Sequence, residues 1–256
     1  MSYINNIFDL ENKTAVIIGG KGVLGSAMAD GLGRAGCKLA LLSPSVTKHD
    51  PNVQKLSATK KTFQCNVQNR AELEHAADRI VETWGEPDIL VNAAGINSTT
   101  PFFDITEEEY EKIINVNLKG TFLACQVFGK HFQNAGKPAS IINISSVTSI
   151  TPLSKVFSYG VSKAGINNLT QFLASEWAKD QIRVNAIVPG FFPAKQNRKI
   201  LTTERVNDIM RHTPMQRFGE PEELIGAVLW LASEKASSFV TGAVIPIDGG
   251  FTAMTI

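Results

Sequence analysis

The chain has 256 residues, of which 43% are hydrophobic and 19% charged, and its formal net charge is +1. This composition is that of an ordinary globular protein with enough apolar residues for a large core. The 25 basic residues are scattered among 24 acidic ones. This distribution argues against a nucleic-acid partner, because such partners are bound through clustered basic surfaces.

The sequence contains no apolar stretch long enough to span a bilayer, and its first ten residues lack the basic and apolar regions of a secretion signal. The three cysteines, Cys37, Cys65 and Cys125, are widely spaced and form no paired or metal-ligand arrangement. We therefore expect a cytoplasmic protein with no membrane partner and no metal site, whose cysteines are reduced core residues.

Short apolar runs bounded by turn residues predict seven strands, at Thr14–Ile18, Lys38–Leu42, Thr62–Cys65, Asp88–Val91, Ser140–Ile144, Arg183–Val188 and Ala243–Ile247. Helical patterns lie between them, at Leu24–Ala35, Arg70–Trp84, Glu107–Phe132, Tyr159–Lys179, Thr203–Arg211 and Glu222–Ala232. Strands that alternate with helices predict an α/β fold, since parallel neighbours need crossover connections. We expect one doubly wound, Rossmann-type domain over residues 1–256, with a parallel seven-stranded sheet and helices on both faces.

Two segments depart from the regular alternation. The segment of residues 43–60 is polar and short, so the helix expected after the second strand must be shorter than usual. Residues 189–217 form a long interruption before the last helix, and such interruptions are often binding loops. We expect this second segment to be the substrate loop.

A glycine-rich turn follows the first strand directly, as Gly19, Gly20, Lys21, Gly22, Val23, Leu24 and Gly25, and a helix begins within it. Glycines let the backbone approach a pyrophosphate, and the free N–H groups at a helix N-terminus favour its negative charge. A glycine cluster alone is also compatible with a flexible turn. Its position after the first strand of an alternating pattern favours dinucleotide binding.

The end of the second strand indicates which nicotinamide cofactor is bound. An Asp or Glu there would hydrogen-bond the adenosine ribose, but this chain has Ser43. A serine does not repel a 2′-phosphate, and Lys21 and Lys48 lie near enough in sequence to offer positive charge. NAD and NADP both stay open, and the pattern favours NADP, although each lysine taken singly is equally compatible with a solvated surface residue.

A candidate catalytic group lies around the fifth strand and the helix that follows it. The strand delivers Ser145 and Ser146 at its carboxyl end, where ligands bind in open α/β sheets. Tyr159 opens the next helix and Lys163 follows at i+4, on the same helix face. An ammonium beside a tyrosine, whose ordinary pKa is about 10, favours the phenolate and makes the residue usable as an acid/base.

Tyr and Lys four residues apart are common on amphipathic helices, and the pair alone would indicate nothing. The order of glycine turn, strand-end serine and Tyr–Lys helix favours catalysis. Asn117 lies within a long helical pattern, where Asn is mildly unfavourable. It could hold a water connected to Lys163, or be a structural residue that faces solvent.

With these motifs in place, the chain resembles the short-chain dehydrogenase/reductase family over nearly its whole length. The matching motifs are Asn92-Ala93-Ala94-Gly95, Asn117, Ser146, Tyr159 with Lys163, Pro189-Gly190 and Asp248-Gly249-Gly250. The resemblance implies a hydride transfer between NAD(P) and an alcohol carbon, and Asn117, Ser146, Tyr159 and Lys163 as the catalytic tetrad. It implies cofactor contacts at Gly19, Lys21, Gly22, Val23, Leu24, Ser43, Asn66, Val67, Asn92, Ala93, Ala94, Gly95, Tyr159, Lys163, Pro189, Gly190 and Phe192.

Within the family, the cofactor turn and several loop residues are similar to D-mannonate oxidoreductase (fructuronate reductase) members and related sugar-acid dehydrogenases. This resemblance implies a sugar-acid substrate, bound by Ser146, Asn97, Phe191, Gln196 and Arg198. Arg198 or Lys195 could pair with its carboxylate, although either is also compatible with a solvated loop charge. The resemblance also implies a homotetramer, with the long helices and residues 241–256 at subunit contacts.

The chain departs from the family pattern at Ile18, Val23, Asn66 and Ala194, each of which weakens one expected cofactor contact. These departures keep open a non-catalytic dinucleotide sensor or scaffold. A 3-oxoacyl carrier-protein reductase is a second alternative, which would be expected to carry a concentrated basic docking patch that the sequence lacks.

Overall fold

The computed structural model describes residues 2–193 and 202–254. Its strands are β1 (Thr14–Ile18), β2 (Lys38–Ser43), β3 (Lys60–Gln64), β4 (Ile89–Asn92), β5 (Ala139–Ile144), β6 (Ile182–Pro189) and β7 (Val244–Ile247). The α-helices within these residues are α1 (Tyr3–Ile7), α2 (Val23–Arg34), α3 (Pro51–Gln54), α4 (Arg70–Trp84), α5 (Glu107–Ile114), α6 (Gly120–Ala135), α7 (Phe157–Trp177), α8 (Thr203–His212), α9 (Ile225–Ala232) and α10 (Glu234–Ser237).

The seven strands form one parallel sheet in the order β3-β2-β1-β4-β5-β6-β7. The predicted doubly wound fold is therefore confirmed. The strand order reverses between β1 and β4, so the loops that follow these two strands diverge. Such a switch point opens a crevice at the carboxyl ends of the strands, which is where ligands bind in this architecture.

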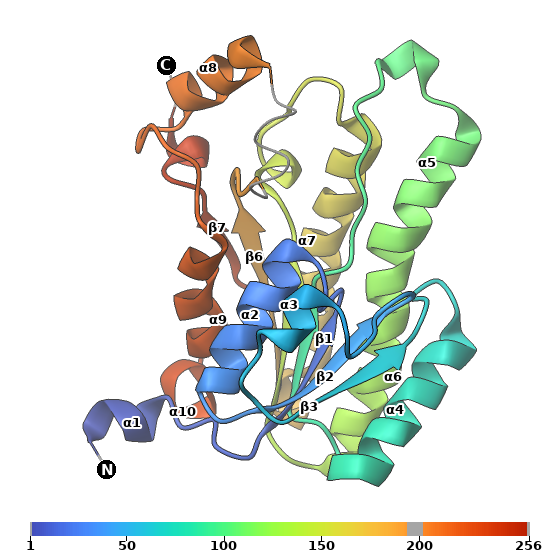
Figure 1. The fold of residues 1–256 in the computed structure, drawn as a ribbon, viewed down its shortest axis with the longest axis vertical. Coiled ribbons are helices and arrows are strands. Elements are labelled where there is room, and N and C mark those ends of the chain that lie inside the picture. Colours follow the sequence, from blue (N-terminus) through green and yellow to red (C-terminus); the bar gives the residue numbers. More distant parts are fainter. Residues whose placement is uncertain (1, 194–201, 255–256) are drawn as a thin grey trace.

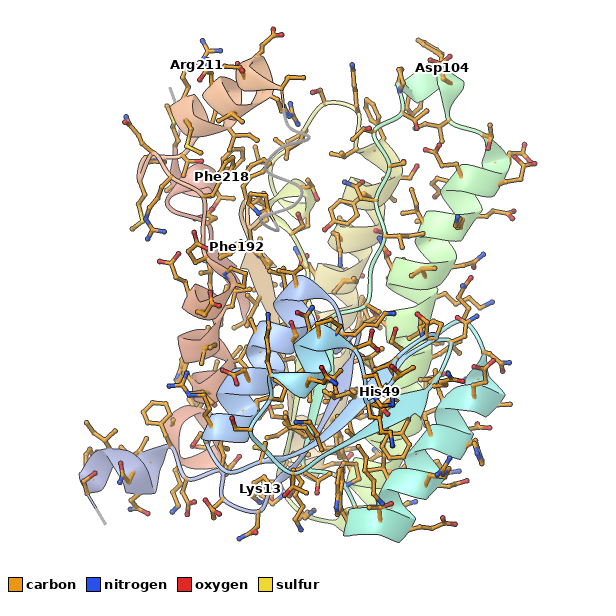
Figure 2. All side chains as sticks on the ribbon, in the orientation of Figure 1. Lys13, His49, Asp104, Phe192, Arg211 and Phe218 are labelled. Carbon is orange, nitrogen blue, oxygen red and sulfur yellow. The ribbon has the colours of Figure 1, made fainter. Side chains whose placement is uncertain are left out.

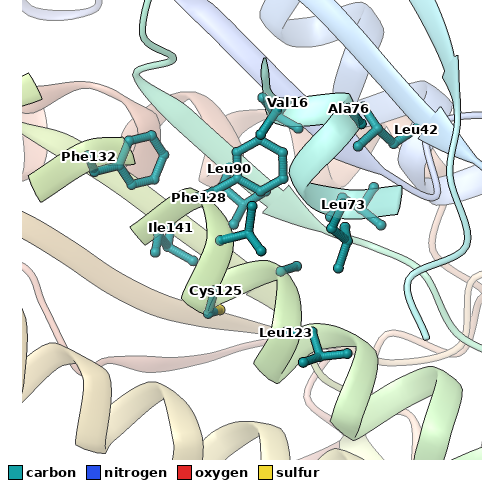
Figure 3. Packing of buried hydrophobic residues seen from close by; sticks show 14 of the residues in the cluster. Val16, Leu42, Leu73, Ala76, Leu90, Leu123, Cys125, Phe128, Phe132 and Ile141 are labelled. Atoms are coloured by element: carbon teal, nitrogen blue, oxygen red, sulfur yellow. The ribbon is translucent and has the colours of Figure 1, made fainter. Parts of the chain in front are cut away.

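Helices cover both faces of the sheet (Figure 1). Alternate strand residues point to opposite faces. Val16 and Leu90 contribute to a core under α4 and α6, where Phe128 and Phe132 are fully buried (Figure 3). Ile17 belongs to a second core, under α2 and α9. These two cores hold the strand ends in fixed positions relative to the helices that carry the site.

The predicted helix over residues 107–132 is interrupted in the structure. A π-helical segment, Asn115–Lys119, separates α5 from α6. Such π-helical segments are rare and frequently occur at functional sites. The helix expected to open at Tyr159 instead begins at Phe157, so Tyr159 lies within the first turn.

Helices α1 and α10 were not predicted, because neither carries an apolar repeat long enough to recognise. Helix α1 is capped by Ser2, whose side chain accepts a hydrogen bond from the Asn5 N–H, and it buries none of its residues. The four-residue α3 is the reduced helix expected after the second strand. Within residues 2–193 and 202–254, no helix combines the length and apolarity that a membrane span requires.

The two ends of the sheet differ in what they carry. Lys13 lies at the amino end, whereas Phe192, Phe218 and α8 lie beyond the carboxyl end (Figure 2). The candidate residues after β1, β4, β5 and β6 therefore all belong to this carboxyl end.

Candidate active site

The carboxyl end of β5 anchors the two serines. Ser145 Oγ donates to the Lys163 carbonyl at 3.1 Å, which ties the strand end to α7. Ser146 caps a 3₁₀-helix, Val147–Ser149, and its Oγ accepts from the Thr148 N–H at 3.3 Å. The Ser146 hydroxyl is also hydrogen-bonded to Tyr159, so both groups can reach the same ligand oxygen.

The side chain of Lys163 is placed between Tyr159 and β5. Its Nζ lies 5.5 Å from the centroid of the Tyr159 ring and donates to the Ile144 carbonyl at 2.7 Å. The residue is only 4% exposed. Burial lowers the pKa of Lys163 to about 8, so its ammonium titrates close to neutral pH.

The pKa of Tyr159 differs from the sequence-based expectation. Burial raises this pKa above its ordinary value, and a hydrogen bond with Ser146 partly offsets the rise. The expected lowering by Lys163 is not found, because the ammonium is directed to the Ile144 carbonyl. In this environment Tyr159 keeps its proton at neutral pH, which suits it to donate a proton to a substrate oxygen.

Asn117 lies in the π-helical segment and is completely buried, so the alternative of a solvent-facing residue is wrong. Its Oδ1 accepts from the Ile96 N–H at 2.8 Å, and its Nδ2 donates to the Ile96 carbonyl at 2.9 Å. The same Nδ2 donates to Ser162 Oγ at 3.0 Å, and Ser162 donates to the Tyr159 carbonyl at 2.7 Å. Asn117 therefore links the loop after β4 to the first turn of α7.

The glycine-rich turn leaves no room for side chains where a dinucleotide would approach. Gly19 has φ of +80°, and a Cβ built on it would lie 2.7 Å from the Ala94 backbone nitrogen. A Cβ on Gly25 would lie 2.3 Å from the Gly19 carbonyl oxygen. Helix α2 begins immediately after Gly22. This cradle at a helix N-terminus fits the pyrophosphate of NAD(P).

A cavity of about 330 Å³ brings most of the predicted catalytic and cofactor residues together. It is lined by Gly22, Val23, Leu24, Gly25, Ala93, Gly95, Ile96, Asn97, Ile144, Ser145, Ser146, Tyr159, Lys163, Pro189, Gly190 and Phe192. Asn117 lies just behind it, because a Cβ on Gly95 would be 3.5 Å from both Asn117 Oδ1 and Lys163 Nζ. The cavity thus joins the phosphate-binding turn to the proton-transfer residues.

A second cavity of about 330 Å³ shares Gly22, Ala93, Gly95 and Ile96 with the first, and continues toward β2. Its other lining residues are Ile18, Gly19, Lys21, Ser43, Pro44, Asn66, Val67, Gln68, Ala94 and Val116. None of them is an Asp or Glu. Lys21 Nζ donates to Ser45 Oγ at 2.6 Å, which holds its positive charge beside this cavity. The two cavities share lining residues, so a dinucleotide with its nicotinamide near Tyr159 could extend into the second cavity and place its adenosine near Ser43.

The remaining predicted residues lie elsewhere. Asn92 is buried and lines neither cavity, and its Nδ2 donates to Asn143 Oδ1 at 2.8 Å, which ties β4 to β5. Phe191 lines a neighbouring cavity of about 370 Å³ and not the one that holds Tyr159. Lys48 is exposed. The predicted positions Ala194, Lys195, Gln196 and Arg198 lie outside the described residues.

Sequence reasoning missed Ile96 and Ser162. Ile96 lines both cavities, and Ser162 connects Asn117 to the Tyr159 backbone. Ile96 directly follows the Asn92–Gly95 motif, so extending that motif by one residue would have found it. Ser162 carries no local signal, because its partner Asn117 is 45 residues away in the sequence.

Comparison with known proteins places this geometry in a family. A family model described as enoyl-(acyl carrier protein) reductase matches residues 20–252. An uncharacterized oxidoreductase of Bacillus subtilis (strain 168), UxuB, is 42% identical, with 96% of each chain covered.

Two solved structures extend the comparison. One, described as a D-mannonate oxidoreductase from Haemophilus influenzae with bound NAD, is 38% identical, covers 98% of this chain and 99% of its own, and has a TM-score of 0.90. The other, described as a 2-deoxy-D-gluconate 3-dehydrogenase from Agrobacterium tumefaciens with bound NADP, is 31% identical, covers 97% of this chain and all of its own, and has a TM-score of 0.87. With this fold, this site and these relatives, the chain belongs to the short-chain dehydrogenase/reductase family of oxidoreductases.

Proposed function

We propose that this enzyme interconverts a secondary alcohol and a ketone on a sugar acid, with NAD(P) as the hydride carrier. The observation that carries the proposal is the convergence of Ser146, Tyr159 and Lys163 on the cavity formed by the glycine-rich turn. The sugar-acid names of two relatives support the substrate class. Residues 189–217 are proposed as the substrate loop.

In the proposed mechanism, the Ser146 hydroxyl donates a hydrogen bond to the ketone oxygen and polarises the carbonyl. Tyr159 donates its proton to that oxygen as negative charge develops on it. A bound nicotinamide would supply the hydride, or accept it in the reverse direction. Lys163, whose Nζ lies 5.5 Å from the centroid of the Tyr159 ring, would hold the ribose of the cofactor. Asn117, whose side-chain amide is fully engaged, acts as a positioning residue for Ile96 and Ser162.

The decisive experiment is a turnover screen of keto-sugar acids, neutral sugars and acyl thioesters, each with NADH and NADPH. We expect turnover with a keto-sugar acid. Tyr159→Phe should abolish that turnover while cofactor binding, measured by nicotinamide fluorescence, stays close to the wild-type value. A Tyr159→Phe variant with near-normal activity would refute the assignment of the proton donor.

We propose NADP as the preferred cofactor. The cavity next to Ser43 is lined by no carboxylate, and Lys21 lies beside it. Lys21→Ala should raise the KM for NADPH about tenfold, as expected when a charged hydrogen bond is lost, and leave the KM for NADH unchanged. Lys48→Ala is the matched control, because Lys48 lines neither of the two cavities. Equal KM values for the two cofactors in the wild type would contradict this preference.

Two other functions are distinguished by the same screen. An acyl carrier protein substrate is suggested by the description of the family model, and would appear as turnover of acyl thioesters. A dinucleotide sensor or scaffold would bind NAD(P)H but oxidise it with none of the substrates.

We propose that the chain assembles as a homotetramer and acts in the cytoplasm. The outward face of α7 carries exposed Phe157, Val161 and Phe172, and the exposed positions between Phe157 and Ser175 include no charged residue. A charge-free apolar face of this kind supports burial against another subunit. Val161→Asp should shift the mass measured by light scattering toward smaller species. Three free, buried cysteines are compatible with a reducing compartment.

A further inference from the structure

Helix α8 lies beyond the carboxyl end of the sheet (Figure 1). The residues that line the catalytic cavity follow the carboxyl ends of the strands. At the end of this helix the His212 ring lies 6.0 Å from the ring of Phe251. Phe251 in turn packs edge-on against Phe191, with centroids 5.4 Å apart. Phe191 directly precedes Phe192, which lines the cavity that holds Tyr159. One end of α8 is therefore attached to a wall of that cavity.

The other end of α8 reaches the loop between Ser146 and Tyr159. Arg205, in the first turn, donates from Nη1 to Ser154 Oγ at 3.3 Å. Ser154 lies in residues 150–156, which connect the 3₁₀-helix capped by Ser146 to α7. Helix α8 thus spans two segments that each lead directly to residues of the cavity.

Arg205 is on the inward face of this helix. Ile209, four residues later and therefore on the same face, is buried. Arg205 is itself half-buried, whereas Glu204 and Arg211 are exposed. A guanidinium that is partly removed from water needs hydrogen-bond partners for its five N–H groups.

No carboxylate neutralises Arg205 within the described residues, where Ser154 is the one hydrogen-bond partner of its side chain. Asp208, one turn further along α8, is paired with Arg211 instead. A second cation, Lys155, follows Ser154 directly and is exposed. Lys155 also has φ of +64°, a conformation that is strained for a side chain of this kind and tends to occur at ligand-binding loops. Among the described residues, the surface formed by Arg205 and Lys155 therefore carries positive charge without a protein counter-ion.

We propose that Arg205, assisted by Lys155, binds the carboxylate of the substrate and so makes the enzyme specific for sugar acids over neutral sugars. The guanidinium fork matches a carboxylate in bidentate fashion, and the contact with Ser154 holds it in place for this role. This inference rests on the proposed function, because it assigns a binding residue to the sugar-acid substrate.

The test compares Arg205→Gln and Arg205→Lys with the wild type, using the best keto-sugar acid from the turnover screen. A hydrogen bond to a charged group is worth enough to change affinity about 10- to 100-fold. We therefore expect Arg205→Gln to raise the KM for the acid by about this factor, with kcat within about threefold of the wild type. Arg205→Lys keeps the charge but loses the fork, so its KM should be intermediate.

The matched control is Arg211→Gln, on the exposed side of the same helix, which should leave both constants unchanged. A neutral polyol with the same carbon chain is tested as substrate or competitive inhibitor, and the preference for the acid over the polyol should fall in Arg205→Gln. Melting temperatures monitor the fold. An unchanged KM, or a loss confined to kcat, would overturn the inference while the proposed function stands. A wild-type enzyme that turns over no sugar acid would overturn the proposed function and the inference together.

Discussion

The burial of Lys163 predicts that this residue reduces the stability of the protein. The pKa of Lys163 falls from 10.5 to about 8 in the folded state, because burial disfavours the charged ammonium. This shift corresponds to about 3 kcal/mol of unfavourable free energy at neutral pH. Replacement by Met removes the buried charge and keeps a similar volume.

The replacement also removes the hydrogen bond from Nζ to the Ile144 carbonyl, whose loss costs about 1 kcal/mol. We therefore expect Lys163→Met to increase the free energy of unfolding at pH 7 by about 2 kcal/mol. The same change should abolish turnover, since the ammonium beside Tyr159 is lost.

The pH dependence gives a sharper test. Between pH 8 and 10.5 the unfolded chain holds the Lys163 proton more tightly than the folded one, so the stability of the wild type rises with pH in this window. The advantage of Lys163→Met should shrink above pH 8 and vanish near about pH 9.5. Urea unfolding at fixed protein concentration and several pH values measures the difference. Lys179→Met, at an exposed position, is the control.

A difference between Lys163→Met and the wild type that does not change between pH 7 and 9.5 would show that the burial argument is wrong. A variant that is less stable at pH 7 would show that the bond to Ile144 outweighs the buried charge.

Three further changes test other parts of the structure. Gly19→Ala should lower the free energy of unfolding, measured with urea, by more than Gly85→Ala does. Both glycines have φ of +80°, but a Cβ meets the backbone only at Gly19. Equal losses of stability would mean that the turn can relax. Asp88 accepts from the Thr14 N–H and two lysines, and although burial raises its pKa, these bonds hold the pKa below its ordinary value. Asp88→Ala should therefore lower the free energy of unfolding by about 3 kcal/mol at pH 7. This difference should diminish as the pH falls below about 4, where the stabilisation by the carboxylate is lost, and a pH-independent difference would contradict the argument. Ser162→Ala removes the link between Asn117 and the Tyr159 carbonyl, and should lower kcat and move the pH profile of kcat, whereas a change in melting temperature alone would indicate a purely structural role.

The sequence by itself determined the strands of the sheet and indicated which residues make up the candidate site. Buried strands such as β1 and β5 are continuous apolar runs, because parallel strands are covered on both faces, and this pattern is visible without neighbours. The glycine turn and the Tyr159–Lys163 spacing are also local features, since each depends on residues within one turn or one helix. Their positions after particular strands followed from the order of the elements along the chain.

Only the tertiary structure decided the environment of these residues. The burial of Asn117, the direction of the Tyr159 pKa and the partner of Lys163 depend on chain segments that are far apart in the sequence. The place of Phe191 in a separate cavity and of Arg205 on the inward face of α8 likewise depends on how loops pack against the sheet. Periodicity records which residues are apolar, but desolvation and hydrogen-bond partners arise from contacts between distant segments, and these set the charges and proton affinities of the site.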